Sequence, residues 1–156
     1  MPLSNYSELQ ASIADWMDRE DLVARIPDFI QLGQAKLRRV LRVREMEIST
    51  TLSPINGVCF LPTNYEEFRA VYASTGTGKP LELFTPDFAI EKYGWSAPAG
   101  VPQYFTLIGN ELRPYPSTTG EVGLIYYQTI PDIAGAPDGE NWLLTKDPRT
   151  YLFASL

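Results

Sequence analysis

The sequence predicts an α+β fold, because helical periodicity at the start of the chain gives way to strand periodicity in its middle. In residues 4–17 and 27–41 apolar side chains recur every three or four positions, which predicts two helices. After residue 43 the period becomes two, and the dipeptides Asn56-Gly57 and Gly109-Asn110 separate strand-like runs. We therefore expect an N-terminal helical hairpin, a mostly antiparallel sheet of β-hairpins and a C-terminal helical start.

The two N-terminal helices each carry a start signal. Asn5 and Glu8 have the spacing of a capping box, and Ser4 is an equally good cap. Pro27 suits the first turn of the second helix. The expected buried stripe of residues 4–17 consists of Tyr6, Leu9, Ile13, Trp16 and Met17, and that of residues 27–41 consists of Phe29, Ile30, Gly33, Leu37, Val40 and Leu41. The polar run 18–21 breaks the pattern, so a short link is expected between the helices.

The rest of the chain divides into short strands and loops. Strands are expected at 46–52, 58–61, 67–73, 103–108, 111–115 and 121–128, with a helix at 86–93 capped by Thr85. As a whole we expect a single domain of residues 1–156: a helical hairpin (1–43), a β-rich region (44–130), a loop (131–147) and the start of a helix (148–156). An apolar helix of one or two turns buries its face poorly, so we expect this last segment to dock on another subunit or to continue in a longer chain.

Composition narrows the possible functions. The 156 residues carry a net charge of −6, which disfavours nonspecific binding to nucleic acid or to a membrane surface. Histidine is absent, which removes the commonest general base and metal ligand. A single cysteine, Cys59, precludes an internal disulfide and a cysteine zinc site, and is expected in the core. No apolar run approaches the ~20 residues of a membrane span, and the polar N-terminus lacks a signal-peptide core.

Three patterns that could carry chemistry have simpler interpretations. The run Thr75–Lys79 suggests a phosphate-binding loop, but Ala73 and Pro80 stand where that motif needs Gly and Ser or Thr. Glu45 and Glu47 are predicted on one strand face and could act as a glycosidase pair, although a solvent-facing edge explains them as well. The acidic residues Asp132, Asp138 and Glu140 lack the spacing of a calcium loop.

A basic cluster lies at the end of the second predicted helix. Its members, Arg38, Arg39, Arg42 and Arg44, could be solvated, could bind nucleic acid or could contact a partner. Because the chain is acidic overall, we favour contact with a partner protein.

The segments described above resemble, over about residues 3–156, the adaptor proteins of tailed bacteriophages, the head-to-tail connector family of short-tailed phages. The matching stretches are residues 41–47, 61–62, 65–69, 79–82, 102–112, Pro114, Pro116, 126–127, 130–131, 141–144, Pro148 and 151–153. Thr63-Asn64 departs from the Ala-Asp that is common in the family. Family members also usually continue as C-terminal helices beyond the position of Leu156.

The resemblance implies a structural virion protein without catalytic, cofactor-binding or metal-binding residues. It implies a ring of about twelve copies below the portal that extends the DNA channel, retains packaged DNA and carries tail tube or nozzle proteins. Double-stranded DNA would pass without sequence-specific contact, no membrane would be involved, and the protein would lie in the host cytoplasm until assembly into the virion. The expected portal contacts are Arg38, Arg39, Arg42, Arg44, Tyr151, Phe153 and Leu156, and the expected contacts with neighbours or the tail are Lys79, Trp95, Asp132 and Asp138.

Two other functions stay open from the residues alone. A tail-associated receptor- or carbohydrate-binding module would use Trp95, Tyr104 and Trp142. A hydrolase would use Glu45 and Glu47.

Overall fold

The computed structural model describes residues 3–74 and 78–156, and the chain clusters into two compact units. Unit 1 consists of Met1–Arg42 and Thr129–Leu156, and unit 2 of Val43–Gln128. The helices of both chain ends therefore share unit 1, while the central strands form unit 2. This α+β arrangement of terminal helices and mostly antiparallel sheets confirms the predicted fold class.

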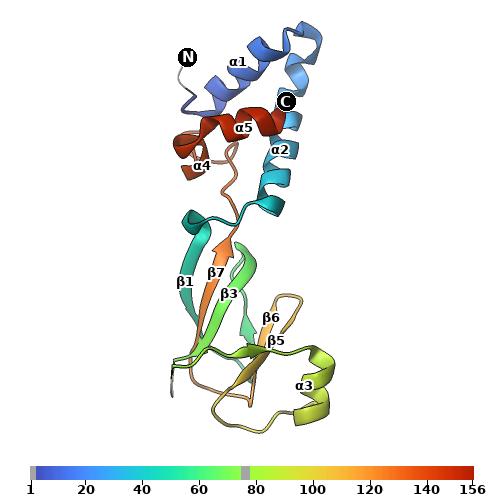
Figure 1. Cartoon of the computed structure of the whole chain (residues 1–156), viewed down its shortest axis with the longest axis vertical. Coiled ribbons are helices and arrows are strands. Elements are labelled where there is room, and N and C mark those ends of the chain that lie inside the picture. Colours follow the sequence, from blue (N-terminus) through green and yellow to red (C-terminus); the bar gives the residue numbers. More distant parts are fainter. Residues whose placement is uncertain (1–2, 75–77) are drawn as a thin grey trace. The chain divides into compact units, whose positions relative to one another are not determined.

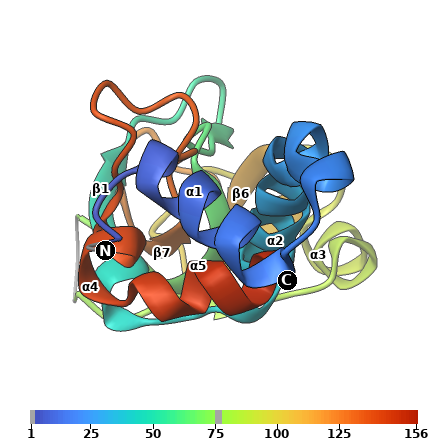
Figure 2. The same ribbon diagram turned by 90° about the horizontal axis from the view of Figure 1, so that it is seen from above.

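Unit 1 is a small helical assembly (Figures 1 and 2). Its helices are α1 (Tyr6–Met17), η1 (Glu20–Arg25), α2 (Ile26–Val40), α4 (Trp142–Lys146) and α5 (Pro148–Ser155). Helix α5 packs against α1, α2 and α4. The large fully buried side chains of this unit are Leu9, Ile13, Ile30, Ile130, Ile133, Leu144 and Tyr151. Both ends of the chain therefore contribute to one core. The helical hairpin of α1 and α2 that the sequence predicts is only part of that core.

The start of α1 satisfies its free backbone donors in the way the sequence predicts. Asn5 Oδ1 accepts a hydrogen bond from the Glu8 amide at 2.9 Å, while the amide and hydroxyl of Ser4 donate to the Glu8 carboxylate at 2.8 and 2.6 Å. Both candidate caps therefore take part. The predicted link contains the short 3-10 helix η1, and α2 begins at Ile26, one residue before Pro27.

The predicted loop 131–147 is wrong for residues 142–146, which form α4. Asn141 initiates this helix, because its side-chain oxygen accepts from the Leu144 amide at 2.9 Å. The Asn141 Nδ2 group donates to the Pro131 carbonyl at 2.9 Å and to the Tyr151 hydroxyl at 2.6 Å. A helix of five residues has too little periodicity to be recognised, and the isolated Asn cap was its main signal.

Unit 2 contains two sheets. One has the order β1-β7-β3, formed by Glu47–Leu52, Val122–Gln128 and Tyr65–Ala73; the other has the order β2-β6-β5-β4, formed by Cys59–Phe60, Glu111–Tyr115, Tyr104–Ile108 and Glu82–Leu83. All pairs are antiparallel except β4–β5, which is parallel. Strand β4 was not predicted, because two residues carry no alternation. The core of unit 2 is formed by Leu52, Cys59, Leu61, Val71, Leu81, Phe105, Leu112, Val122, Leu124 and Tyr126.

The two predicted hairpin turns have different outcomes. Gly109-Asn110 joins β5 to β6, with Ile108 opposite Glu111, as predicted. Asn56-Gly57 also makes a tight turn, since both residues have positive φ and Ile55 and Val58 exchange two backbone hydrogen bonds. The expected pairing of the flanking strands is wrong, however, because β1 pairs with β7 and β2 pairs with β6. Pro54 has no amide to continue a ladder, which is consistent with the change of sheet there.

Helix α3 (Pro86–Tyr93) and Phe84, which precedes it, contact β5 through aromatic rings. Phe84 stacks on Tyr104 with ring centroids 3.9 Å apart, and Lys92 Nζ lies 4.5 Å from the Tyr104 ring centroid. Thr85 occupies the N-cap position without a side-chain hydrogen bond.

Candidate partner-binding surfaces

Unit 1 exposes an aromatic pair made by its two ends. Trp16 of α1 and Phe153 of α5 meet edge to face with centroids 6.0 Å apart, yet their exposed fractions are 60% and 62%. Trp16 was expected in the buried stripe, so this part of the prediction is wrong. Leu156 is also exposed, whereas Tyr151 is completely buried and belongs to the core. Of the three predicted contact residues on α5 or directly after it, Phe153 and Leu156 are accessible to a partner.

The basic cluster divides into structural and surface members. Arg38 Nε donates to the Ile130 carbonyl at 3.0 Å, and Arg42 Nη1 donates to the carbonyls of Arg38 and Leu41 at 2.8 and 2.6 Å. These two guanidinium groups hold the main chain of unit 1 in place. Arg39 is exposed on α2, and Arg44 is exposed on η2 (Arg44–Met46) in unit 2. Arg39 and Arg44 are thus the members that a partner could contact most readily.

A groove beside α2 brings together residues that the sequence keeps far apart. It has a volume of about 230 Å³ and is lined by Tyr6, by Asp28 and neighbouring residues of α2, and by Asp132–Ala134. Asp132 Oδ1 accepts a hydrogen bond from the Ala134 amide at 3.2 Å, which fixes this turn. Burial, followed by the carboxylates of Asp132 and Asp28, raises the pKa of Tyr6. The groove is therefore electronegative. Asp138, the other predicted contact of this loop, is exposed outside the groove lining.

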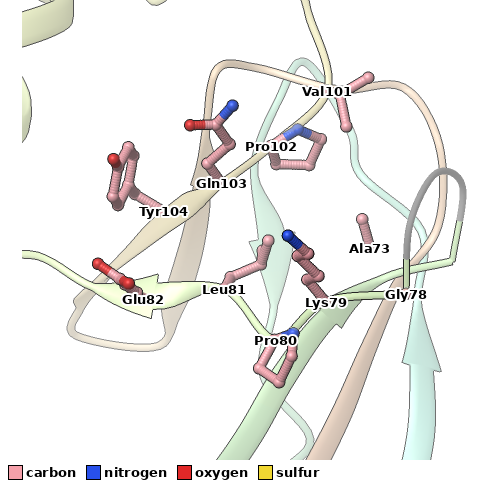
Figure 3. A pocket seen from close by; sticks show the side chains of 10 residues that line it. All are labelled: Ala73, Gly78, Lys79, Pro80, Leu81, Glu82, Val101, Pro102, Gln103 and Tyr104. Carbon is pink, nitrogen blue, oxygen red and sulfur yellow. The ribbon is translucent and has the colours of Figure 1, made fainter.

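In unit 2, Lys79 lines a pocket of about 430 Å³ (Figure 3). Its side chain points toward the segment 101–103, and the other residues that line the pocket are Ala73, Gly78, Pro80, Leu81, Glu82 and Tyr104. The predicted loop with the incomplete phosphate-binding pattern is Thr75–Lys79, and its residues 75–77 lie outside the described part of the chain.

Trp95 is the most exposed large apolar residue described, at 81%. It lines a separate pocket of about 200 Å³ with Asn56, Arg113 and Ser117. The proposed aromatic platform of Trp95, Tyr104 and Trp142 is not assembled within either unit. Tyr104 is stacked in the ring cluster at α3, and Trp142 belongs to unit 1.

The prediction that Glu45 and Glu47 lie on one face of a strand is wrong. Glu45 lies in η2, and only Glu47 belongs to β1. The Glu47 Oε1 atom is 3.1 Å from Arg69 Nη1 and accepts a hydrogen bond from the Tyr127 hydroxyl at 3.3 Å. The adjacent Met46 is buried, whereas Ile48 is 38% exposed. The ion pair with Arg69 and the hydrogen bond from Tyr127 therefore explain Glu47 as a structural residue.

Cys59 is fully buried, and burial raises the pKa of its thiol to about 11. A thiol in that state is an inert core group. Among the described residues, no group of three or more Cys, Asp or Glu side chains is arranged to hold a metal ion. Within residues 3–74 and 78–156, no helix combines the length and apolar character that crossing a membrane requires.

Exposed aromatic and apolar side chains of this kind are typical of a protein that joins other proteins. A family model that describes an adaptor protein matches residues 4–156, and no curated protein matches the chain. The chain belongs to the SU10 adaptor protein family, whose namesake phage is short-tailed. Membership confirms the predicted resemblance and implies a structural, head-tail adaptor role in the phage particle.

The sequence did not reveal two features of these surfaces. The groove between Tyr6 and Asp132 depends on contact between the two ends of the chain, which no local pattern encodes. The exposure of Leu32 on α2 did have a signal, because Leu32 lies outside the apolar stripe that the helical period defines. Val40 was expected inside that stripe but is 72% exposed, so this part of the prediction is wrong.

Proposed function

We propose that this chain forms a ring that joins the portal to the tail, extends the DNA channel and retains the packaged genome. The family match over residues 4–156 carries the proposal. The pair of exposed aromatic rings on α1 and α5 supports it, because contiguous exposed apolar surface marks sites of association. Phe153 and Leu156, with Arg39 and Arg44, are the accessible residues that we assign to the portal contact.

The charge of the chain supports a channel function. Unit 2 carries nine carboxylates against five Lys and Arg side chains. A ring that directs such carboxylates toward its lumen repels the phosphate backbone, so the DNA slides through without adhering. Lys79, Trp95, Asp132 and Asp138 are our candidates for contacts with neighbouring copies or with tail tube or nozzle proteins.

Particles made without this chain test the proposal. We expect heads that package DNA but then lose it and carry no tail, and we expect the intact chain supplied in trans to restore both properties. Mutant particles that retain DNA and attach tails normally would overturn the proposal. Replacing lumen-facing carboxylates by Lys should slow ejection of the DNA; unchanged retention and ejection would reject the channel assignment alone.

One observation favours a second function, that of a tail-associated carbohydrate-binding module. Trp95 offers an exposed ring beside a pocket that contains the polar side chains of Asn56, Arg113 and Ser117. Binding of host-surface glycans by the isolated chain, abolished by Trp95→Ala, would favour this function. Absence of glycan binding together with assembly on the portal would favour the ring.

A further inference from the structure

Two surfaces of unit 1 carry opposite charge and flank the same helix. We propose that they are the two halves of the contact between adjacent copies, so that α2 of one copy inserts Lys36 into the acidic groove of the next. This inference rests on the proposed ring and names the surface that builds it.

The first surface, called the α2 stripe, consists of Leu32, Lys36 and Val40. Leu32 and Val40 are 68% and 72% exposed, and Lys36 lies one helical turn from each. The sequence places no Asp or Glu between residues 29 and 44, so Lys36 has no acidic neighbour along this part of the helix. The stripe thus presents a positive charge between two exposed apolar side chains.

The second surface, called the Tyr6 groove, is the cavity of about 230 Å³ lined by Tyr6, Asp28, Gln31, Gln34, Asp132 and Ile133, with Pro27, Ile30 and Ala134. Its lining contains two carboxylates and no cation. Arg25 reaches Asp28 only at 3.5 Å, in a pair whose side chains are both more than half exposed, so it neutralises the groove weakly. Burial, and after it the carboxylates of Asp132 and Asp28, raise the pKa of Tyr6, so both acidic groups act on this side chain.

The two surfaces lie on different sides of α2. At 3.6 residues per turn, Lys36 lies about 160° around the helix from Gln34 of the groove and about 80° from Asp28. At 1.5 Å per residue it lies about 7.5 Å along the axis from Gln31 and about 12 Å from Asp28. A ring needs two different patches on each copy, and the stripe and the groove are two such patches.

The chemistry of the contact follows from the side chains. The ammonium group of Lys36 is positioned between the carboxylates of Asp28 and Asp132 of the neighbour, while its methylene stem covers the apolar floor. Leu32 and Val40 then cover the rim of the groove and exclude water from the ion pairs. Both exposed apolar residues of the stripe thereby become buried.

The test compares charge-reversed full-length chains for ring formation on the purified portal of the same phage, imaged by electron microscopy over a concentration series. Lys36→Glu and Asp132→Lys should each raise the concentration for half-maximal assembly at least about tenfold. An equimolar mixture of the two variants should recover most of the assembly, because stripe and groove become complementary in an alternating ring. The double variant of one chain should recover it as well.

Matched controls separate the contact from effects on folding. Reversing an exposed ion pair outside both surfaces, Arg19→Glu with Asp21→Arg, should leave assembly unchanged. Asp132→Asn keeps a side-chain acceptor for the Ala134 amide, and Lys36→Gln keeps the helix. If either charge-reversed variant fails to fold, these milder variants replace it, and they should also weaken assembly.

The possible results have distinct meanings. Wild-type rings with normal assembly of both reversed variants, or weak variants without recovery on mixing, would overturn this inference and leave the proposed function intact. Absence of rings from the wild-type chain on the portal would overturn the proposed function and this inference together.

Discussion

Gly33 of α2 lies directly against the main chain of α5 at Ala154. A Cβ atom at position 33 would come within 2.8 Å of the Ala154 carbonyl oxygen and 3.0 Å of the Ser155 hydroxyl. Both neighbours are constrained, because the carbonyl belongs to a helix backbone and the hydroxyl donates to the Tyr151 carbonyl at 2.8 Å. The absence of a side chain at Gly33 thus sets how closely the two ends of the chain approach each other.

We expect Gly33→Ala to destabilise the protein, although Ala is the better helix former by about 1 kcal/mol. The added methyl group must separate α2 from α5, and overpacking of this kind costs about 1–3 kcal/mol. Urea unfolding followed by circular dichroism measures the change. Gly135→Ala is the matched control, since nothing lies within 4 Å of its Cβ, and it should stay within about 0.5 kcal/mol of wild type. A Gly33→Ala protein more stable than wild type would contradict the close packing of these helices.

Asn141 is predicted to contribute more stability than an ordinary helix cap. Asn141→Ala removes three hydrogen bonds, to Leu144, Pro131 and Tyr151, and leaves the buried Tyr151 hydroxyl without this donor. We expect a loss of about 2–4 kcal/mol in the free energy of unfolding. Asn5→Ala, which removes the half-buried cap of α1, should cost only about 1 kcal/mol. Equal losses in the two variants would show that the buried network adds nothing to capping.

Cys59 should make the protein sensitive to alkali. Burial raises the pKa of the folded thiol to about 11 from 9.0, so the protonated thiol stabilises the folded state fully below pH 9. This contribution is lost as the pH rises from about 9 to about 11, by up to about 3 kcal/mol. The free energy of unfolding measured from pH 8 to 11 should therefore fall more steeply for wild type than for Cys59→Ala.

The same series has an internal control. Burial also raises the pKa values of Tyr65 and Tyr151, which gives both proteins a common alkaline decline. The difference in slope between wild type and Cys59→Ala is the contribution of the thiol. Identical slopes, or rapid labelling of native Cys59 by a thiol reagent at pH 8, would contradict its placement in the core.

Phe153 is expected to serve association more than folding. Phe153→Ser removes one ring of the exposed aromatic pair, and we expect it to weaken binding to the portal at least about tenfold, because exposed aromatic anchors carry much of the binding energy of interfaces. Sedimentation with purified portal measures this effect. Val23→Ser, which changes a half-exposed apolar residue of η1, is the control and should bind normally. Normal portal binding by Phe153→Ser would remove this residue from the contact.

Elements with a clear period or turn chemistry were predictable from the sequence. Helix α2 and the β5–β6 hairpin were found because fifteen residues of helical periodicity and a Gly-Asn turn act locally. Strand β4 and helix α4 escaped, since so few residues form each that their conformation depends on a partner strand or a capping side chain.

The surfaces were less predictable than the fold. Periodicity placed Trp16 in the buried stripe of α1, but it could not show that Phe153 from the other end of the chain covers one edge and leaves the rest exposed. Residues of one type also differ by position: Arg38 and Arg42 bond to main-chain carbonyls, while Arg39 is exposed on the surface. Tertiary contacts of this kind determine which charged and aromatic groups can reach a partner.

An electron microscopy reconstruction of the intact chain mixed with the portal of its phage tests the central proposal most directly. The proposal predicts a closed ring on the tail-facing side of the portal, coaxial with the DNA channel and with unit 1 in the contact between copies. A reconstruction in which the chain is absent from the portal vertex, or is bound there as isolated single copies, would contradict it.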